Sequence, residues 1–262
     1  MKIGKDLGIK FFLKNFLLLT VILIFWEIFS SLIFPRFNPT AHNILPPPSS
    51  VIVTGWQLFQ NGKLVVHILV SLKRILIGFF LAVILGVPLG VLMGISKKIR
   101  LQVAPLVELL RPVPPFAWLP LALLWFGIGD RGSIFLIVIA AVFPIILNTV
   151  AGIEKIDIKL LHAAQSLGCE QKDKLLIKII LPASLPSIFL GLRVGLGLSW
   201  MVLVGAEMIG SISGLGYLIL DSRNLLLPAQ AILGMAVIAM LGYLLDLGIR
   251  KLSSQILIWA ES

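Results

Sequence analysis

The stretch EKIDIKLLHAAQSLGCEQKDKLLIKIILP, residues 154–182, is a charged segment that lies between two long apolar runs. Apolar side chains recur in its first half at helical spacing and form one stripe, made of Ile156, Leu160, Ala164 and Leu167. Gly168 stands where the end of a helix favours a residue that can adopt a positive φ. Pro182 is expected to end a second helix, because proline lacks the backbone N–H of the helical ladder. The stretch therefore predicts a helix, a glycine turn and a second helix between two membrane spans.

The composition of the whole chain excludes an ordinary soluble domain. Hydrophobic residues make up 58% of the 262 positions and charged residues only 13%, and the mean hydropathy is +1.05. Several apolar runs approach the roughly 20 residues that a helix needs to cross a bilayer. We therefore predict an all-α fold, a polytopic membrane protein with six transmembrane helices that form one domain over residues 1–262.

The formal net charge of +10 is explained by membrane topology rather than by nucleic-acid binding. Lys and Arg cluster in alternate loops, as the positive-inside rule requires. Of the 22 Lys and Arg, 15 lie on segments predicted to be inside and one, Arg193, lies within a span. The other 6 are predicted to be outside, namely Arg36, Lys63, Lys73, Arg74, Arg131 and Arg223. The basic N-terminal residues precede an apolar run at 16–34 that is long and has no small-x-small cleavage site after it. This pattern predicts an uncleaved first span and both termini in the cytoplasm.

The sequence contains little that could support covalent chemistry. Cys169 is the single cysteine, which excludes an intrachain disulfide, and the three His are scattered without metal-ligand spacing. The phosphate-binding pattern GxxxxGK[ST] is absent. We therefore expect no catalytic residue, no metal site and no cofactor in this chain, so that any ATP-driven motor must be another chain.

A second informative stretch is LLRPVPPFAWLP, residues 109–120, which places four prolines within nine residues. Such a segment cannot form one unbroken helix, because each proline removes a backbone donor. At membrane depth, the freed carbonyls are tolerated only where protein or a water-filled cavity satisfies them. We therefore expect this segment to line a cavity.

Other predicted spans contain residues that indicate helix packing. Glycines recur every fourth residue on one face of the span at 66–95 and should let another helix approach closely, namely Gly86, Gly90 and Gly94. Glu27 lies within the first span and is expected to face another helix or the outer interface. Asp246 and Arg250 are spaced i,i+4 near the end of the last span and are expected to pair.

The stretch at 154–182 resembles the EAA loop of ATP-binding-cassette (ABC) importer permeases, in the order His-Ala-Ala, three residues, Gly, a spacer and Leu-Pro. This resemblance implies a coupling loop that docks into an ATPase subunit through His162, Ala163, Ala164, Gly168, Leu181 and Pro182. Two features depart from the family pattern: His162 stands where Glu is usual, and the spacer is about one residue longer. The alternative is an ordinary cytoplasmic loop whose lysines set the topology.

The proline-rich stretch resembles the Arg-Pro-x-Pro-x-x-Ala-Trp/Leu-x-Pro segment of permeases for sulfonates, taurine, nitrate and bicarbonate. The stretches FPIILNT at 143–149 and GLRVGLGLSW at 191–200 fit the same subfamily. The resemblance covers about residues 45–250 and implies a type I ABC importer permease-like fold with a core at about 64–252. The candidate pathway residues are Arg111, Pro112, Pro114, Pro115, Trp118, Asn148, Arg193 and Glu207.

Two of these residues could favour an anion, and each has an alternative interpretation. Arg111 and Arg193 would supply a positive field along the pathway. Alternatively, Arg111 anchors the inner end of its span, and Arg193 snorkels or holds a helix contact.

The resemblance implies a permease subunit of an ATP-driven importer, without enzymatic activity of its own. Its expected partners are a second permease copy as a homodimer, ATP-binding subunits that hold ATP and Mg, an extracytoplasmic solute-binding protein and the lipid bilayer of the bacterial cytoplasmic (inner) membrane. The expected solute is sulfonate or taurine, nitrate or bicarbonate, and the alternative is a thiamine precursor or a riboflavin-like solute. A gradient-driven secondary transporter would need paired carboxylates or His at mid-span and inverted repeats. A channel would need a filter motif, and neither pattern is found in the sequence.

Overall fold

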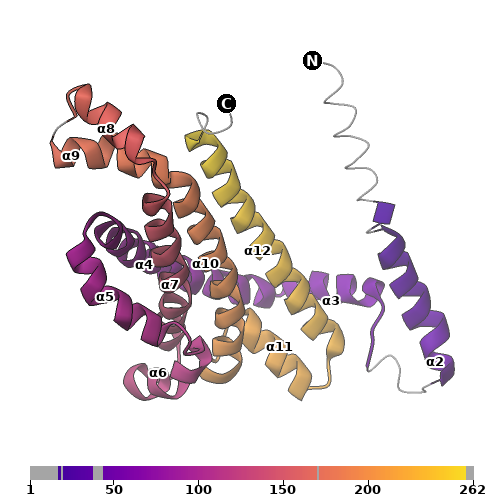
Figure 1. Cartoon of the computed structure of the whole chain (residues 1–262). Helices are drawn as coiled ribbons and strands as arrows, with labels where there is room; N and C mark the ends of the chain where they lie inside the picture. The colour runs from indigo at the N-terminus through magenta and orange to yellow at the C-terminus, as the bar shows by residue number, and fades with distance from the viewer. Residues whose placement is uncertain (1–16, 19, 38–43, 170, 258–262) are drawn as a thin grey trace, which may run out of the picture. The chain divides into compact units, whose positions relative to one another are not determined.

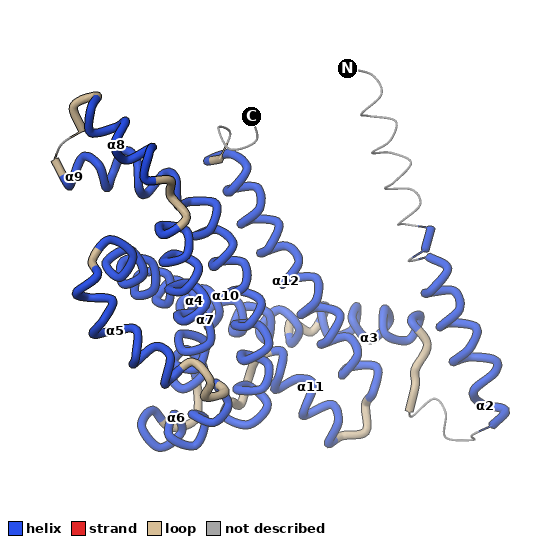
Figure 2. Tube along the Cα trace, viewed as in Figure 1, coloured by secondary structure: helices blue, strands red, loops and turns tan. Residues whose placement is uncertain are grey.

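The computed structural model describes residues 17–18, 20–37, 44–169 and 171–257, and this described part is helical with no strand (Figures 1 and 2). In chain order the elements are η1 (Phe29–Ile33), α2 (Phe34–Phe37), α3 (Pro48–Gln60), α4 (Lys63–Ile95), α5 (Lys97–Leu110), η3 (Pro115–Trp118), α6 (Leu119–Phe126), α7 (Asp130–Glu154), α8 (Ile158–Ser166), α9 (Lys172–Leu175), η4 (Leu176–Ile180), α10 (Leu181–Gly210), α11 (Leu215–Asn224) and α12 (Pro228–Ile256). The predicted all-α class is confirmed. Part of the charge pattern lies outside the described residues, namely Lys2, Lys5, Lys10 and Lys14.

Among the described residues, four helices are long and apolar enough to cross a membrane: α4, α7, α10 with the turns before it, and α12. The pair formed by α5 with η3 and α6 passes the same test but is bent by 86°. The apolar helix Thr20–Ile33 is shorter. The described residues therefore supply four or five of the six predicted spans, and the remaining one or two stay predictions.

The chain divides into two compact units, and each is described by itself. The first comprises residues 1–66 and 218–236, and the second comprises 67–217 and 237–262. In the first unit, the Glu27 carboxylate accepts hydrogen bonds from the backbone N–H and Oγ of Ser49 at 3.0 and 2.8 Å. Since Ser49 lies in the first turn of α3, the expectation that Glu27 faces another helix is confirmed. The single permease domain over the whole chain stays a prediction.

In the second unit, α4 packs on α7 through glycines. A Cβ at Gly86, Gly90 or Gly94 would lie 2.8, 2.6 or 2.7 Å from side-chain atoms of Ile145, Thr149 and Ile153, respectively. No side chain fits at such distances, so the two backbones lie close together, as predicted. Gly78 makes a fourth contact of this kind, against Ile137.

The same device joins α7 to α10. A Cβ at Gly152 would lie 2.6 Å from the Cβ of Ser187, and one at Gly191 would lie 2.8 Å from the Cβ of Asn148. The two helices run side by side, with α8 and α9 at one end of the pair and α6 at the other (Figure 1). Thus α4, α7 and α10 form a closely packed block.

Prolines act differently in two places. The proline-rich stretch breaks its helix as predicted, since α5 ends at Leu110 and η3 begins at Pro115. The prediction that Pro182 ends a helix is wrong, because the chain stays helical from Lys172 into α10. A π-helical turn precedes the proline, and Leu181 donates its N–H to the Leu176 carbonyl five residues back. The donor missing at Pro182 therefore falls where the hydrogen-bond register changes.

Candidate functional site

The loop between α7 and α10 begins with a capped short helix. Asp157 precedes α8 and accepts a hydrogen bond from the N–H of Lys159 at 2.8 Å. At the other end of α8, Gly168 has φ +92° and donates to the carbonyl of Gln165, and Cys169 donates to the carbonyl of Ala164. These two bonds make a Schellman motif, which satisfies the last carbonyls of the helix. The predicted glycine turn is confirmed.

The six predicted coupling residues differ in exposure: His162, Ala163 and Gly168 are exposed, Ala164 is buried, and Leu181 and Pro182 are half-buried. Large apolar side chains of α8 and its end also face outward, and Leu167 is 86% exposed. Exposed apolar residues in a charged loop form a surface that another protein can cover.

A cavity of about 710 Å³ lies between the proline-rich stretch, α7 and α10. Its lining residues are Arg111, Val113, Pro114, Pro115, Phe116, Ile139, Ala140, Phe143, Pro144, Leu147, Asn148, Ala151, Val194, Leu198, Met201 and Val202. The prediction that the proline-rich stretch lines a cavity is confirmed. The cavity brings together four of the candidate pathway residues, namely Arg111, Pro114, Pro115 and Asn148.

The lining of this cavity is mostly apolar, with one cation and one amide. Arg111 follows α5 directly as its C-terminal cap residue. Asn148 lies on α7 and donates its Nδ2 to the carbonyl of Pro144 at 2.8 Å, so part of its hydrogen-bonding capacity is used within its own helix. Arg111 is therefore the charge that a solute in this cavity would meet.

Two other candidate pathway residues belong to the proline-rich stretch but lie outside the cavity lining. Pro112 lies in the turn after α5. Trp118 ends η3 and packs against a buried cluster that contains Leu119 and Ala122. Both residues therefore shape the break in the helix rather than the cavity surface.

Arg193 lies on α10 and faces α12. Its Nε donates to Asp246 Oδ1 at 2.9 Å, and Asp246 also accepts from Arg250 Nε at 2.6 Å. The predicted pairing of Asp246 with Arg250 is confirmed. The carboxylate of Asp246 offsets the charge of Arg193, as the helix-contact interpretation expects.

The last candidate, Glu207, belongs to a buried polar cluster at the Asp130 end of α7. We call this cluster the Arg74 network; it consists of Ser71 and Arg74 on α4, Asp130 on α7 and Glu207 on α10. Arg74 donates to Glu207 Oε1 at 2.9 Å and to Asp130 Oδ1 at 2.8 Å, and Ser71 Oγ donates to Glu207 Oε1 at 2.8 Å. The side chains of Arg74 and Glu207 are 2% and 0% exposed. Each buried charge thus faces an opposite charge, which burial requires.

The backbone turn at residues 211–216 closes over the Arg74 network. Arg74 Nη1 donates to the carbonyl of Ser213 at 2.7 Å. The N–H of Leu215 donates to Ser71 Oγ at 2.8 Å. The turn is therefore bonded to α4 through both of these side chains.

The same turn contacts α10 through glycines. The N–H of Gly216 donates to Glu207 Oε2 at 2.8 Å. Gly214 has φ +116°, and a Cβ there would lie 2.3 Å from the carboxyl carbon of Glu207. Both observations show that the backbone presses directly on the carboxylate, an approach that only glycine permits.

Sequence reasoning placed Glu207 on the pathway and counted Lys73 and Arg74 as outer charges that set topology. An acid within an apolar run does signal a buried partner. The sequence does not identify that partner, because Arg74 lies 133 residues away from Glu207. Lys73 pairs with Asp130 at 2.8 Å but is itself exposed.

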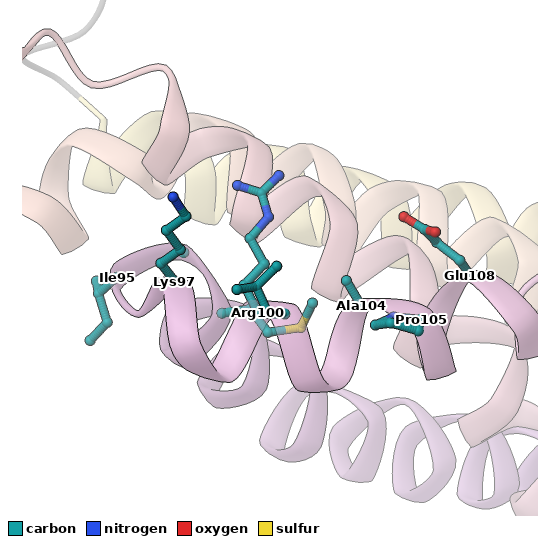
Figure 3. Close-up of a pocket in the computed structure, with 9 residues that line it drawn as sticks. Ile95, Lys97, Arg100, Ala104, Pro105 and Glu108 are labelled. Carbon is teal, nitrogen blue, oxygen red and sulfur yellow. The ribbon is translucent and has the colours of Figure 1, made fainter.

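The Glu154 end of α7 is built differently. Glu154 pairs with Arg100 near the start of α5, and both side chains are exposed. A cavity of about 540 Å³ beside them is lined by residues of α5 and the end of α4. Lys97, Arg100 and Glu108 point to one side of α5 (Figure 3). Over the described residues, no three His, Cys, Asp or Glu are placed to hold a metal ion.

Comparison with a family model gives a match over residues 86–254. The model is described as "Binding-protein-dependent transport system inner membrane component". The matched range contains α5, α7 and α10, the cavity beside Arg111 and the whole loop at 154–182.

Two relatives illustrate the similarity at the level of sequence. The chain is 40% identical over 220 residues to the taurine transport system permease protein TauC of Escherichia coli strain K12, which covers 82% of this chain and 80% of that protein. It is 35% identical over 230 residues to the nitrate import permease protein NrtB of Synechococcus elongatus, which covers 84% of this chain and 80% of that protein.

A solved structure shows the same fold at lower identity. The chain aligns with a chain of the MetNI methionine ABC transporter in an inward-facing conformation, with a TM-score of 0.65 and 17% identity. The alignment covers 75% of this chain and 97% of that chain.

Proposed function

The chain belongs to the family of binding-protein-dependent transport system inner membrane components and is a permease subunit of an ABC importer; on this premise we propose that it moves a small anion through the cavity beside Arg111. The observation that carries this proposal is the lining of the cavity, with one permanent cation among apolar walls. A volume of about 710 Å³ is within the range of small-molecule sites. Sulfonate or taurine, nitrate and bicarbonate are the proposed solutes.

The loop at 154–182 supports a proposed ATPase partner. Ala163 and Gly168 leave little bulk on its exposed surface, and Leu167 presents an apolar side chain to it. In this proposal His162, Ala163, Ala164 and Gly168 seat the partner, and ATP and Mg stay with the partner. Leu181 and Pro182 link the seat to α10.

The proposed assembly contains two copies of the permease and an extracytoplasmic solute-binding protein. In the proposed orientation, the Glu154 end of α7 faces the cytoplasm and the Asp130 end faces outward, with both termini inside. The lysines between Glu154 and Pro182 support this orientation, since basic loops stay on the inner side.

The test is uptake into proteoliposomes that contain the importer purified through a tag on this chain. We expect an ATP-binding subunit to co-purify and labelled taurine or nitrate to accumulate when ATP and the binding protein are supplied. Arg111→Gln should lower the maximal uptake rate by about tenfold, because the anion loses its one permanent counter-charge in a low-dielectric cavity.

Arg131→Gln is the matched control, since Arg131 is exposed, lies at the Asp130 end of α7 and does not line the cavity. Parental uptake by the Arg111 variant at normal expression would remove Arg111 from the pathway. Accumulation of a thiamine precursor in place of every anion would overturn the proposed solute class.

A further inference from the structure

We infer that Arg74 is a positioning residue that holds the turn at residues 211–216 against α4 and the outer ends of α7 and α10, so that the turn and these helices move as one body. This inference rests on the proposed function, which gives the motion its role in transport, and on the proposed orientation, which places these helix ends on the outer side. The contacts themselves belong to the described structure.

The side chain of Arg74 joins several elements. The guanidinium of Arg74 donates to Asp130 on α7, to Glu207 on α10 and to the carbonyl of Ser213 in the turn. A guanidinium has five donors in a rigid plane, whereas a lysine ammonium is a single point charge. Arginine is therefore suited to hold three separate elements at once from a fourth.

The turn at residues 211–216 also has contacts that do not involve Arg74. Ile212 is 77% exposed, so its side chain does not anchor the turn within this chain. Gly214 donates its N–H to His67 Nδ1 at 3.1 Å, and its missing side chain leaves room for the carboxylate of Glu207. Buried apolar contact begins only at Leu215. Ser211 is buried without a hydrogen-bond partner for its hydroxyl, so Ser213 and Gly214 supply the polar contacts of this part of the turn, and Arg74 makes the one to Ser213.

The helices that meet at Arg74 are also connected to the loop at 154–182. This loop leaves α7 at Glu154 and enters α10 at Leu181, so it joins the two helices whose other ends meet at Arg74. Gly152 and Gly191 pack these helices backbone to backbone between the two ends. A displacement at the loop is therefore passed along a closely packed block, and Arg74 attaches the turn to the far end of that block.

A distance measurement tests this inference on the permease alone. The single native cysteine is removed by Cys169→Ser, and spin labels are attached at two exposed positions through Ile212→Cys and Leu92→Cys. Leu92 lies 18 residues after Arg74, about 27 Å along α4, a separation that pulsed electron paramagnetic resonance resolves. The labelled permease is diluted with an excess of unlabelled Cys169→Ser permease, so that distances within one copy dominate. The parent in lipid nanodiscs should then give one narrow distance distribution.

Arg74→Lys keeps the charge but not the planar set of donors. We expect it to broaden the distribution at least about twofold, because a point charge cannot hold Asp130, Glu207 and Ser213 together. Lys73→Gln is the matched control, since Lys73 is adjacent and exposed and contacts Asp130 alone among these three. Its distribution should equal that of the parent.

Asp130→Asn keeps the inference testable if Arg74→Lys does not insert. It removes only the carboxylate on α7 and should give intermediate broadening. If the variants that insert keep the parental distribution, the turn is held by the packing of Leu215 and the inference is wrong.

A second readout separates positioning from simple loss of stability. In the assembled importer, Arg74→Lys should lower the solute moved per ATP hydrolysed by about tenfold, because a released turn no longer follows the block and a buried charge loses its partners. A variant that is merely less stable would lower transport and hydrolysis together, with an unchanged ratio. If no ATPase co-purifies, the proposed function fails, while the distance measurement still decides whether Arg74 positions the turn.

Discussion

The two ends of α7 carry the same kind of ion pair in opposite surroundings. Asp130 at one end and Glu154 at the other each pair with an arginine of a neighbouring helix. The partner of Asp130 is Arg74; the Asp130 side chain is 36% exposed, but that of Arg74 is 2% exposed and also bonds Glu207. The partner of Glu154 is Arg100, and these two side chains are 47% and 40% exposed for Arg100 and Glu154.

This difference shows at which end of α7 the ion pair contributes more to holding the helix in place. Removing one partner of a buried, hydrogen-bonded pair costs about 3–5 kcal/mol, since a charge stays buried without a counter-charge. An exposed pair contributes about 0–1 kcal/mol. Ion pairing therefore holds the Asp130 end of α7 to α4 more firmly than it holds the Glu154 end to α5, where the contact depends on apolar packing of Val107 with Ile146 and Val150.

The largest effect is expected for Glu207→Ala. This change leaves the buried Arg74 with Asp130 as its remaining counter-charge, removes the buried acceptor of Ser71 and Gly216, and creates a cavity where the Glu207 side chain was. We expect the free energy of unfolding to fall by about 3–5 kcal/mol, as measured by titration of the detergent-solubilised protein with sodium dodecyl sulfate.

Glu108→Ala serves as the control for that measurement. Glu108 is an exposed acid near the end of α5 and lines the smaller cavity. Its removal should change the free energy of unfolding by less than about 0.5 kcal/mol, as for surface substitutions generally. Equal losses in both variants would mean that the Arg74 network is no stronger than an exposed charge.

The next prediction concerns the turn at residues 211–216 and leaves the charged side chains of the Arg74 network unchanged. Gly214→Ala places a Cβ 2.3 Å from the carboxyl carbon of Glu207 in a backbone with φ +116°. Gly127→Ala is the matched variant, because Gly127 has φ +72° with no atom within 4 Å of an added Cβ. Strain alone should cost about 1–3 kcal/mol at Gly127, whose φ of 72° and ψ of −173° are adopted essentially by glycine alone, and the same titration should show a larger loss at Gly214. Equal losses would show that the turn does not press on Glu207.

Local rules predicted most of the block that separates these two ends. The glycine spacing on α4 indicated close packing because it depends only on positions within one helix. The proline-rich stretch indicated a broken helix beside a cavity because four prolines remove four donors whatever surrounds them. Both features are properties of a short segment, so the sequence alone is enough.

The Arg74 network could not be predicted in this way. It joins residues 133 positions apart, and its energy comes from burial that only the packed helices create. Pro182 shows a related limit, since the rule that proline ends a helix fails where a π-helical turn absorbs the missing donor. Sequence patterns predict the structure of single segments well and predict contacts between distant segments poorly.

A third experiment tests whether the Glu154 end acts in coupling rather than in stability. Gly168→Asp adds a charge and a side chain to an exposed turn with φ +92°. We expect ATP hydrolysis stimulated by solute and binding protein to fall to the basal rate. The free energy of unfolding should drop only about 1–2 kcal/mol, the cost of a non-glycine residue in that conformation.

Normal stimulated hydrolysis in the Gly168 variant would show that the loop does not seat the ATPase. A stability loss as large as that of Glu207→Ala would instead show that this end is as firmly fixed as the other. Pro182→Ala is a companion variant to Gly168→Asp, since alanine restores a backbone N–H donor at residue 182 within a continuous helix.

Matched acid-to-amide changes at the two ends of α7 complete the comparison, and the change at Glu154 has the smallest expected effect. Asp130→Asn should lower the free energy of unfolding by about 1–3 kcal/mol, because Arg74 then keeps a weaker neutral acceptor. Glu154→Gln should change it by less than about 0.5 kcal/mol, and high salt should remove even that difference, since water and ions screen an exposed pair. Equal losses, or a salt-independent loss at Glu154, would contradict the assignment of a strong ion pair to one end and a weak one to the other. A near-zero effect at Glu154 with retained transport would show that transport does not require the pair with Arg100.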